Sequence, residues 1–347
     1  MNPIKINWFI PPNHVNRFIP DWLAKPAKLG YHNYDQVSAS VWLRCLQLIP
    51  YLEKKGVRCR VNDFSASADI SVFVRWQNDQ AYDCLQQRKD KGEIIIFDQC
   101  VNYLDVTGTF PGNYGSTEQT RKEFLRMAKL SDAFTCPSEF IRQRAAQEGI
   151  LAHYIPESVD LRHFKGSKTK ESLNQRGLTA IWSGQPIKVS ELNDLIPLLE
   201  KRNISLVLIS EKKPEISGKF NYLSWSYYTF PQTILNGDFC LSPRKTDNPY
   251  DLGHSHFKIG VFMAQGIPAL ASPLPSYLEV IQKTGGGKIC ESNSDWESAL
   301  DCITENRNIL WEWSQAARKG MIAHYSTENV VKQYIILFEQ LLGSKAQ

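Results

Sequence analysis

The residue types best suited to hold a phosphorylated ligand lie together in the stretch GHSHFK, which begins at Gly253. Ser255 can cap a helix that starts there, and Lys258 falls in the first turn of that helix. The free N–H groups and the dipole of a helix start attract an anion, to which His254 and His256 can add hydrogen bonds. Gly253 permits close approach of the backbone. The pattern predicts an anion-binding loop with Lys258 as its principal cation. Polar surface is the alternative for the histidines, and a solvated helix position is the alternative for Lys258.

Two further loops supply groups suited to the same ligand. Gly184 and Gln185 follow the apolar pattern TAIWS and can present backbone N–H groups, with Lys188 shortly after them. Arg244 follows the apolar pattern DFCLS, although a solvated loop position is an equally good account of it. Negative charge grows on a phosphate that leaves during group transfer, so fixed cations near it accelerate the reaction.

The elements that must position these groups alternate between strand and helix, which favours α/β domains with parallel sheets. After the GHSHFK loop, a helix is predicted to end at Gly266, and Pro268–Ala271 to form a buried strand. Other strands are predicted at 4–10, 69–74, 93–98, 133–136 and 152–155, and in TAIWSG, ISLVLIS, NYLSW, DFCLSP and GGGKIC.

The predicted helices each carry one apolar face. The first spans 40–55, and Pro50 should kink it near Leu46. Ser294 and Glu297 have the spacing of a capping box before another helix. The remaining helices are predicted after the Ser138 cap and at 78–90, 189–202, 277–283, 295–304 and 327–342.

Length and composition indicate two ordinary domains, since the chain has 347 residues, of which 42% are hydrophobic and 22% charged. The polar, Gly-flanked segment 166–177 is predicted to link them. Segment 11–37, rich in Pro and Asn, is too long for an ordinary connection and is predicted to be a functional loop. The net charge of +4 argues against a dedicated nucleic-acid binder and permits weak attraction to anionic lipid.

Several other classes of protein are disfavoured by missing motifs. No P-loop, G-x-G-x-x-G or G-x-S-x-G occurs, which disfavours P-loop kinases, dinucleotide dehydrogenases and serine hydrolases. The eight Cys show no Cys-x-x-Cys pair, so buried free thiols in a reducing compartment are expected. No apolar run suits a signal peptide or a membrane span, and a cytosolic protein is the default expectation.

Two stretches resemble a known group of enzymes, the GT-B glycosyltransferases. KIGVFMAQGIPALAS resembles the helix, turn and strand that line their nucleotide-sugar site, and the matching positions are Lys258, Met263, Ala264, Gly266 and Pro268. HYIPESVDLRHF resembles the end of their first domain, through Ile155, Pro156, Val159, Asp160 and Phe164. The Glu-(seven residues)-Glu motif of the large retaining families is not kept, because Gly253 and Val261 occupy its two places.

The resemblance extends more weakly to the first half of the chain. SASVWLRC resembles a helix start whose Ser and Arg face the cleft, matched here by Ser40 and Arg44. The polar face of an amphipathic helix is the alternative for Arg44. FDQCVNYLD resembles an acidic stretch of the same group, with Asn102 where a second acid is common. Asp98 ends a strand, where open α/β sheets bind ligands, and is expected to contact acceptor hydroxyls or to act as a base.

The resemblance implies a GT-B fold, with two Rossmann-like doubly wound domains facing a cleft. The first, acceptor-side domain is expected at 1–165, and the second, nucleotide-sugar-binding domain at 178–326. The C-terminal helix at 327–342 would cross back onto the first domain. The chain is most similar in pattern to the bacterial group 1 (retaining) sugar transferases of surface-glycan synthesis.

The implied activity is transfer of a sugar from a nucleotide-sugar donor to a hydroxyl of a glycan or lipid-linked acceptor, as in bacterial lipopolysaccharide, capsule or surface polysaccharide synthesis. Asp98 and Lys258 are the expected catalytic residues. The expected donor-binding residues are Gly184, Gln185, Lys188, Arg244, Gly253, His254, Ser255, His256, Lys258 and Glu279. Glu279 is the candidate to hold the ribose in place of the missing Glu, with an ordinary exposed helix residue as the alternative.

No metal and no cofactor is expected, because GT-B sites manage the leaving phosphate with cationic side chains and helix N–H groups. The expected location is the cytoplasm, with peripheral association at the inner face of the cell membrane permitted and no nucleic-acid partner. Two alternatives to transfer stay open. One is a GT-B-fold sugar-nucleotide epimerase, and the other is a non-catalytic GT-B-like binding subunit.

Overall fold

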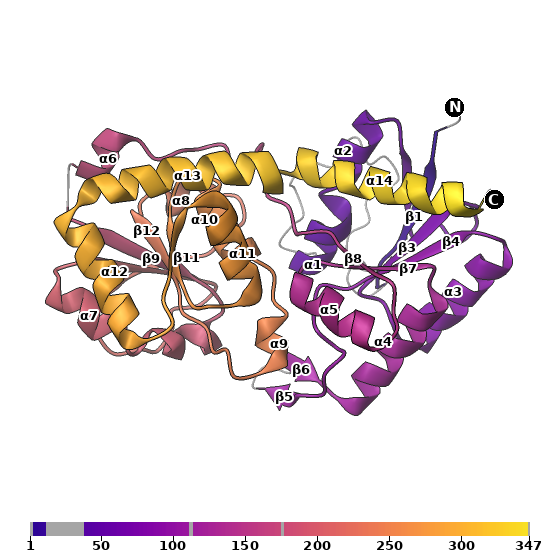
Figure 1. The fold of residues 1–347 in the computed structure, drawn as a ribbon, viewed down its shortest axis with the longest axis horizontal. Helices are drawn as coiled ribbons and strands as arrows, with labels where there is room; N and C mark the ends of the chain where they lie inside the picture. The colour runs from indigo at the N-terminus through magenta and orange to yellow at the C-terminus, as the bar shows by residue number, and fades with distance from the viewer. Residues whose placement is uncertain (1–2, 12–37, 111–113, 175–176, 346–347) are drawn as a thin grey trace. The chain divides into compact units, whose positions relative to one another are not determined.

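The computed structural model describes residues 3–11, 38–110, 114–174 and 177–345 (Figure 1). These residues form two units. Unit 1 comprises residues 1–158 and 327–347, and unit 2 comprises residues 159–326. The predicted functional loop at 11–37 lies, apart from Pro11, outside the described residues.

Unit 1 is built on a parallel six-stranded sheet in the order β2-β1-β3-β4-β7-β8. The strands are β1 (Lys5–Phe9), β2 (Arg58–Val61), β3 (Ile70–Val74), β4 (Ile94–Asp98), β7 (Ala133–Cys136) and β8 (Ala152–Tyr154). The helices are α1 (Ala39–Val41), the π-helical η4 (Trp42–Leu46), α2 (Ile49–Lys54), α3 (Asp79–Asp90), α4 (Glu118–Leu130), α5 (Glu139–Gln147) and α14 (Thr327–Lys345). A two-stranded hairpin, β5 (Gly108–Phe110) and β6 (Tyr114–Ser116), stands apart from the sheet.

Unit 2 repeats this architecture, with a parallel six-stranded sheet in the order β11-β10-β9-β12-β13-β14. The strands are β9 (Thr179–Ser183), β10 (Ser205–Ser210), β11 (Asn221–Ser224), β12 (Phe239–Ser242), β13 (Ala269–Ala271) and β14 (Gly287–Ile289). The helices are α6 (Lys170–Asn174), the 3-10 helix η5 (Pro186–Leu192), α7 (Ile196–Lys201), α8 (Phe230–Ile234), α9 (Pro249–Leu252), α10 (Phe257–Met263), α11 (Pro275–Thr284), α12 (Asn293–Glu305) and α13 (Arg307–Tyr325).

Both sheets have helices on their two faces, as their continuously apolar central strands require. In unit 2, one face packs against α10, α11 and α13, and the other packs against α7 and α12. In unit 1, α3 and α4 cover the face that carries Phe73 and Phe97, while Trp8 on the opposite face contacts Tyr334 of α14. The predicted doubly wound α/β class is therefore confirmed.

Helix boundaries differ from the predictions mainly where proline intervenes. The helix predicted at 40–55 is interrupted after η4 and restarts at Ile49, because Pro50 has no N–H to continue the hydrogen-bond ladder. The single helix predicted at 189–202 was wrong: η5 and α7 replace it, and Pro197 lies in the first turn of α7. The capping box before α12 is made by Ser292 and Asp295 rather than by Ser294 and Glu297.

Segment 166–177, predicted to link the domains, is partly packed within unit 2. Lys168 is buried and its Nζ lies 3.0 Å from Oδ1 of Asp238. The carbonyl of Gly166 accepts a hydrogen bond from Arg318. The chain passes from unit 1 to unit 2 before this segment, between Ser158 and Val159.

The centre of unit 1 is a buried ion pair between Arg44 and Asp98. Nη2 of Arg44 lies 2.6 Å from Oδ2 of Asp98, and Nη1 donates to the carbonyl of Ile155 at 2.6 Å. Thr135 and Tyr334 also donate to this carboxylate, at 2.6 and 3.2 Å. Both charged side chains are at most 1% exposed, so these bonds replace the water that the two charges lose.

We predict that Arg44→Met strongly destabilises unit 1. The substitution leaves a buried carboxylate without its cation, a loss of about 3–5 kcal/mol in comparable cases. Hydrogen exchange of the β4 amides reports the free energy of unfolding of this unit alone. Arg142→Met, which removes a solvent-exposed ion pair with Glu139, is the matched control and should change little. Equal effects of the two substitutions would contradict the assignment.

Candidate functional site

The sheet of unit 2 changes direction between β9 and β12. From β9 the chain proceeds to β10 and β11 on one side, and then returns to place β12, β13 and β14 on the other. Loops on the two sides of such a switch point diverge and leave room for a ligand at the carboxyl ends of the strands. The loops that follow β9 and β12 are those that contain Gly184 and Arg244.

A cluster of five charged residues lies at this end of the sheet, and we call it the cation cluster: Lys188, Glu191, Arg244, Asp251 and Lys258. Nη2 of Arg244 contacts Oδ1 of Asp251 at 2.5 Å, and Nζ of Lys188 lies 3.4 Å from the same oxygen. Nη1 of Arg244 is 3.9 Å from Oε1 of Glu191. When Lys258 is protonated, three cations share two carboxylates, and the cluster then carries an excess of positive charge.

Lys258 is the least satisfied member of the cation cluster. Its Nζ lies 5.0 Å from the centre of the Trp182 ring, and within the described part of the chain it has neither an ion pair nor a hydrogen bond. Burial, followed by the nearby charge of Arg244, lowers the pKa of Lys258 to about 7. Near neutral pH the side chain therefore changes charge readily, and an anion beside it would favour the protonated form.

Two other polar atoms of the cluster are also unsatisfied. Nε of Arg244 and Oε2 of Glu191 are buried and have no hydrogen-bond partner among the described residues. The side chain of Arg244 is only 5% exposed. Buried polar groups are normally paired, so such atoms indicate a place where a ligand or ordered water completes the hydrogen bonding.

The local fold explains why these side chains converge. Asn248 caps α9 by accepting a hydrogen bond from the N–H of Asp251 at 2.8 Å, and this fixes the carboxylate that holds Arg244. The backbone N–H of Arg244 donates to the hydroxyl of Ser272, just after β13, at 2.9 Å. Gly184 is required because a Cβ at this position would lie 2.7 Å from the ring of Trp182.

The GHSHFK loop is arranged differently from the prediction. Ser255 does accept a hydrogen bond from the N–H of Phe257, at 3.3 Å, but the residue that precedes α10 is His256. His254 lies beside the cation cluster: its Nδ1 is 3.0 Å from the carbonyl of Tyr250, and burial lowers its pKa to about 4. The imidazole of His254 is therefore neutral at pH 7.

His256 is buried beside Tyr325, and its prediction as a donor ligand stays untested. The residue is 1% exposed and its ring lies 4.3 Å from that of Tyr325, in the interior of unit 2. Glu279 accepts a hydrogen bond from the hydroxyl of the same tyrosine at 3.2 Å, and its role with a ribose stays a prediction. Val261, in the place of the second family Glu, is a core residue that is 3% exposed.

The other predicted donor residues are distributed around the cation cluster. Gln185 is exposed and precedes η5, which carries Lys188. Gly253 ends α9 with an ordinary negative φ of −76°, so no special backbone freedom is used there. Lys188, Arg244, His254 and Lys258 are thus the predicted residues that the structure brings together.

The predicted acceptor residues of unit 1 are mostly structural. Asp98 is fully buried and saturated by its bonds, so the prediction that it faces an acceptor as a base is wrong. Arg44 forms the same ion pair. Asn102 stabilises a turn by accepting a hydrogen bond from the N–H of Leu104. Ser40 is 9% exposed, and its hydroxyl accepts a hydrogen bond from Arg75.

Arg75 is a residue that the sequence reasoning missed. It directly follows β3, at the switch point between β1 and β3 of unit 1, and is half-buried. Its φ is +53°, a left-handed conformation that an arginine adopts at an energetic cost and that is concentrated at functional sites. Its guanidinium donates to the hydroxyls of Ser40 and Tyr103 at 2.7 and 3.2 Å. The strand-end rule, applied to VFVRW, would have found it.

Residues 3–11, 38–110, 114–174 and 177–345 contain no group of three or more His, Cys, Asp or Glu placed to hold a metal ion. None of the helices in these ranges is long and apolar enough to cross a membrane.

Comparison with known proteins gives no match in sequence. No protein-family model matches the chain. No curated protein matches it.

Several solved structures do resemble it. HepE from Anabaena, in complex with UDP and glucose, is 11% identical over 97% of this chain and 100% of its own, with a TM-score of 0.62. Sucrose-phosphate synthase from Thermosynechococcus elongatus is 10% identical over 98% of this chain and 100% of its own, with a TM-score of 0.60. AviGT4, a glycosyltransferase involved in avilamycin A biosynthesis, is 10% identical over 99% of each chain, with a TM-score of 0.61.

TarM is also similar, at 13% identity and a TM-score of 0.58, over 78% of this chain and 54% of its own. This chain thus spans about half the length of TarM. At these identities the likeness establishes the fold alone. The two parallel six-stranded sheets match glycosyltransferase structures over nearly the full chain, and the protein therefore has the GT-B fold.

Proposed function

We propose that this protein is a glycosyltransferase that moves a sugar from a nucleotide-sugar donor to a hydroxyl of a glycan or lipid-linked acceptor. The observation that carries the proposal is the cation cluster at the switch point of a GT-B fold. Its three basic side chains suit the diphosphate of a donor, because a bound anion favours the protonated form of Lys258. Synthesis of bacterial lipopolysaccharide, capsule or other surface polysaccharide, at the cytoplasmic face of the membrane, is part of the same proposal.

The cation cluster fits the chemistry of a departing nucleoside diphosphate. When the bond between the sugar and the diphosphate breaks, negative charge builds on the phosphate oxygens, and fixed cations stabilise it. Arg244 is held in place by Asp251 before any ligand arrives, which lowers the cost of ordering the site. Lys258 has no such carboxylate partner within the described residues. A phosphate oxygen of the donor would supply the negatively charged partner. In this scheme Arg244 orients the diphosphate and Lys258 neutralises the developing charge.

The ligands named for the similar structures support a nucleotide-sugar donor. HepE has been solved with UDP and with UDP-glucose. A mutant TarM has been solved with UDP, fondaparinux and alpha-GlcNAc-glycerol. UDP and UDP-glucose are therefore the first compounds to test with this chain.

The acceptor is proposed to bind near Arg75 in unit 1. The two hydroxyl contacts of its guanidinium show that this strand end presents a cation and polar side chains rather than an apolar surface. An inverting transfer needs a base to deprotonate the acceptor, and Asp98 is not available for that role because its ion pair buries it.

We predict that UDP binding at pH 8 is accompanied by proton uptake at Lys258. With a pKa of about 7, about nine in ten of these side chains are neutral at pH 8 in the free protein. A neighbouring diphosphate would raise this pKa, so that the side chain takes up a proton from the buffer. Calorimetry in Tris and in HEPES measures the uptake, because the two buffers differ in ionisation enthalpy. Lys258→Met should weaken binding and remove most of the uptake.

Lys319→Met, on the exposed face of α13, is the matched control and should leave both quantities unchanged. Unchanged uptake in Lys258→Met would remove Lys258 from the site. If UDP, the other nucleoside diphosphates and their sugars all fail to bind at millimolar concentration, the donor site is wrong. A sugar product isomeric with the donor and formed without release of UDP would indicate an epimerase instead.

A second prediction concerns the stability of the ligand-free protein. The folded-state pKa of Lys258, about 7, lies below the value of 10.5 for an unperturbed lysine. The unfolded state therefore binds more protons between these values, and the free energy of unfolding rises with pH across this window. In Lys258→Met this contribution is absent. Urea denaturation from pH 7 to pH 9.5 should show a wild-type stability that rises relative to the variant, and parallel curves would contradict the lowered pKa.

A further inference from the structure

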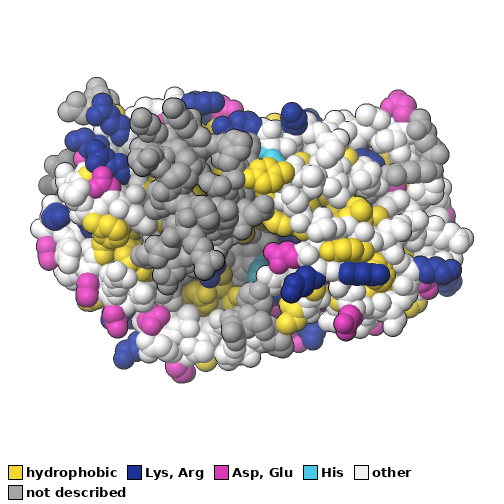
Figure 2. Space-filling model, turned by 180° about the vertical axis from the view of Figure 1, so that it is seen from behind, with side chains coloured by type: hydrophobic (Ala, Val, Ile, Leu, Met, Phe, Trp, Pro, Cys, Tyr) yellow, Lys and Arg dark blue, Asp and Glu magenta, His cyan; other side chains and the backbone are white. Residues whose placement is uncertain are grey.

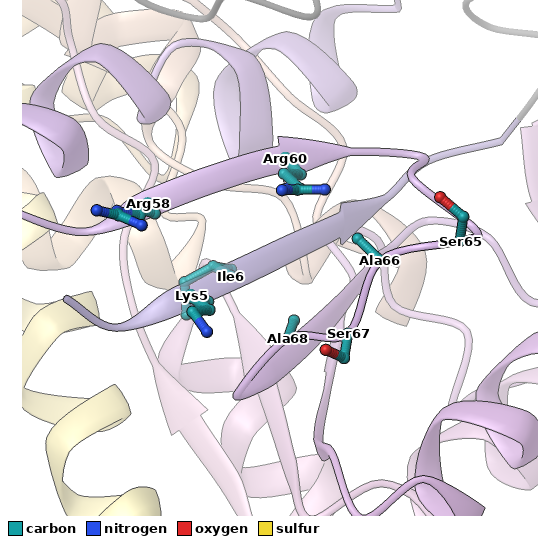
Figure 3. A pocket seen from close by; sticks show the side chains of 8 residues that line it. All are labelled: Lys5, Ile6, Arg58, Arg60, Ser65, Ala66, Ser67 and Ala68. Carbon is teal, nitrogen blue, oxygen red and sulfur yellow. The ribbon is translucent and has the colours of Figure 1, made fainter. Parts of the chain in front are cut away.

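A second hollow lies in unit 1, away from the carboxyl ends of its strands. Its volume is about 500 Å³, and we call it the β1–β2 pocket: it is lined by Lys5, Ile6, Arg58, Arg60, Ser65, Ala66, Ser67 and Ala68 (Figure 3). In Figure 2, Lys and Arg side chains gather at the upper left of the view, in the part of unit 1 from which the chain starts. We propose that the β1–β2 pocket binds a phosphate ester.

The pocket exists because a loop takes the place of a crossover helix. β2 and β3 are parallel and lie on opposite sides of β1, so the chain must cross β1 between them. Such crossings usually take a connection of a dozen or more residues, most often with a helix that covers the face of the sheet. Here residues 62–69 make the crossing without a helix, so among the described residues a loop, and not a helix, lies over the face beside the edge strand β2.

The exposed face of the two strands concentrates positive charge. Lys5 of β1 is paired in register with Arg58 of β2, and Arg60 lies two residues further along the same strand. Side chains alternate between faces along a strand, so these three cations share one face. Arg60 is paired with Asp63 at 2.6 Å. The side chains of Lys5 and Arg58 have no ion pair or hydrogen bond within the described ranges.

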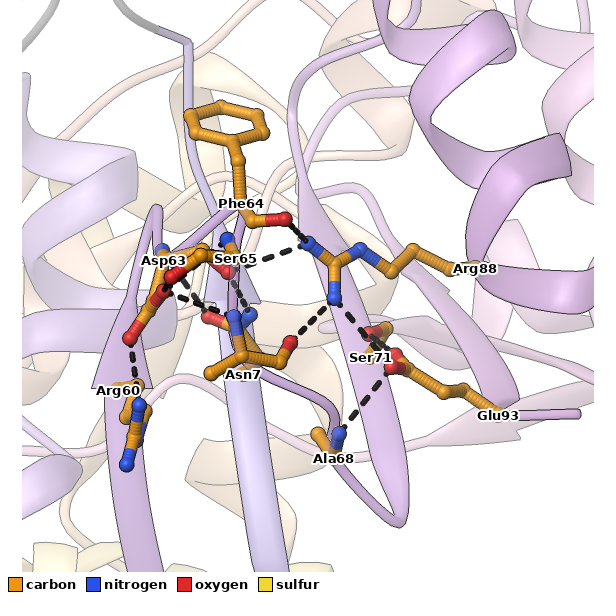
Figure 4. A network of polar contacts seen from close by, with 10 residues as sticks. Asn7, Arg60, Asp63, Phe64, Ser65, Ala68, Ser71, Arg88 and Glu93 are labelled. Atoms are coloured by element: carbon orange, nitrogen blue, oxygen red, sulfur yellow. Dashed lines mark hydrogen bonds and ion pairs between the residues drawn. The ribbon is translucent and has the colours of Figure 1, made fainter. Parts of the chain in front are cut away.

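The opposite wall of the pocket is a loop held in a fixed shape by a buried ion pair. Arg88 and Glu93 lie 3.3 Å apart with side chains that are 2% exposed (Figure 4). The guanidinium of Arg88 donates to the carbonyls of Asp63, Phe64 and Ala66, at 3.1, 2.6 and 2.5 Å. One side chain thereby satisfies three carbonyls of the loop.

Further bonds fix the same loop from its two ends. Glu93 accepts from the N–H of Ala68 at 3.1 Å. Oδ1 of Asp63 accepts from the N–H and the hydroxyl of Ser65, at 3.2 and 2.8 Å. Asn7 of β1 donates to the carbonyl of Asp63 at 2.7 Å. The wall that carries Ser65 and Ser67 is thus ordered before a ligand binds, which lowers the entropic cost of binding.

These features define the chemistry of the ligand. Lys5 and Arg58 offer two positive charges that have no ion pair among the described residues, and Ser67 offers a hydroxyl donor, which suits a doubly charged oxyanion. The hydroxyl of Ser65 already donates to Asp63 and can only accept. The pocket is larger than a phosphate ion and within the range of small-molecule sites, so an organic group attached to the phosphate also fits. A soluble sugar or polyol phosphate and the headgroup of a phospholipid share this chemistry.

Charge on an edge strand has a second known use, which is to prevent pairing with the edges of other chains. That use requires neither a hollow nor a buried ion pair that orders the facing loop. The two accounts predict different results for the same substitution, because only the binding site loses affinity for phosphate when the charge of Arg58 is reversed.

The test uses the full-length chain, with glycerol 3-phosphate as the soluble probe and vesicles of phosphatidylcholine containing phosphatidic acid as the lipid probe. Calorimetry and vesicle flotation measure the two. Arg58→Glu should weaken binding about tenfold or more, since a charge-assisted contact is replaced by repulsion. Lys122→Glu, an exposed lysine on α4 with the same change in charge, is the matched control and should bind as the wild type does.

Two further variants locate the binding. Lys258→Met should retain it, which separates this pocket from the cation cluster of unit 2, so the two proposals fail independently. Arg88→Met should weaken binding although it leaves Lys5 and Arg58 in place, and hydrogen exchange of the β3 amides shows whether unit 1 remains folded. If Arg88→Met does not fold, Arg58→Glu alone decides.

The outcomes discriminate clearly. Binding of glycerol 3-phosphate without flotation assigns a soluble ester, and flotation with weak soluble binding assigns a lipid headgroup; both support the pocket. The proposal is overturned if the wild type binds neither probe. It is also overturned if Lys122→Glu loses as much affinity as Arg58→Glu, or if Arg58→Glu only promotes aggregation.

Discussion

Unit 1 depends on the burial of one ion pair. Arg44 and Asp98 lose their water, and the cost of several kcal/mol per charge is offset only when every remaining bond is made. Those bonds come from β7, through Thr135, from the residue after β8, and from α14, through Tyr334. The pair therefore makes distant segments interdependent, and the C-terminal helix completes the carboxylate's hydrogen bonding although it lies more than two hundred residues away in the sequence.

Unit 2, in contrast, leaves part of its buried charge without hydrogen-bond partners among the described residues. Lys168 and Asp238 form a closed pair in its interior, but the cation cluster at the strand ends is left incomplete. Lys258 has a lowered pKa, and Arg244 and Glu191 each have a buried atom without a partner among the described residues. Unpaired buried groups lower the stability of the free protein. The same groups remain able to form hydrogen bonds with an anion. Binding sites commonly show this loss of stability in exchange for function.

The sequence predicted the fold well, and it predicted several of the residues that the structure brings together in the cation cluster, for physical reasons. Buried parallel strands are continuous apolar runs, so all were found except β2, whose RCRV pattern alternates charge because it is an edge. Helix α13 was missed although its buried positions repeat at helical spacing. The strand-end rule pointed to Arg244, which lies in the cation cluster and whose role with a donor stays a prediction. It failed for Asp98, because the rule locates a residue on a strand and cannot say whether another segment, here η4, will bury its side chain.

The way the chain enters and leaves unit 2 has a consequence for how such a protein can be rebuilt. The N–H of Val159 donates to the carbonyl of Tyr325 at 2.8 Å, and the hydroxyls of Ser158 and Thr327 lie 3.1 Å apart. Unit 2 is thus an insertion whose two ends meet, and the chain of unit 1 nearly closes without it. Excising residues 159–326 and joining the cut ends through a short Gly-Ser bridge leaves unit 1 its closing helix, whereas truncation after residue 158 removes it. Gene fusion and domain exchange within this architecture therefore need two junctions, one after residue 158 and one before residue 327, rather than a single junction.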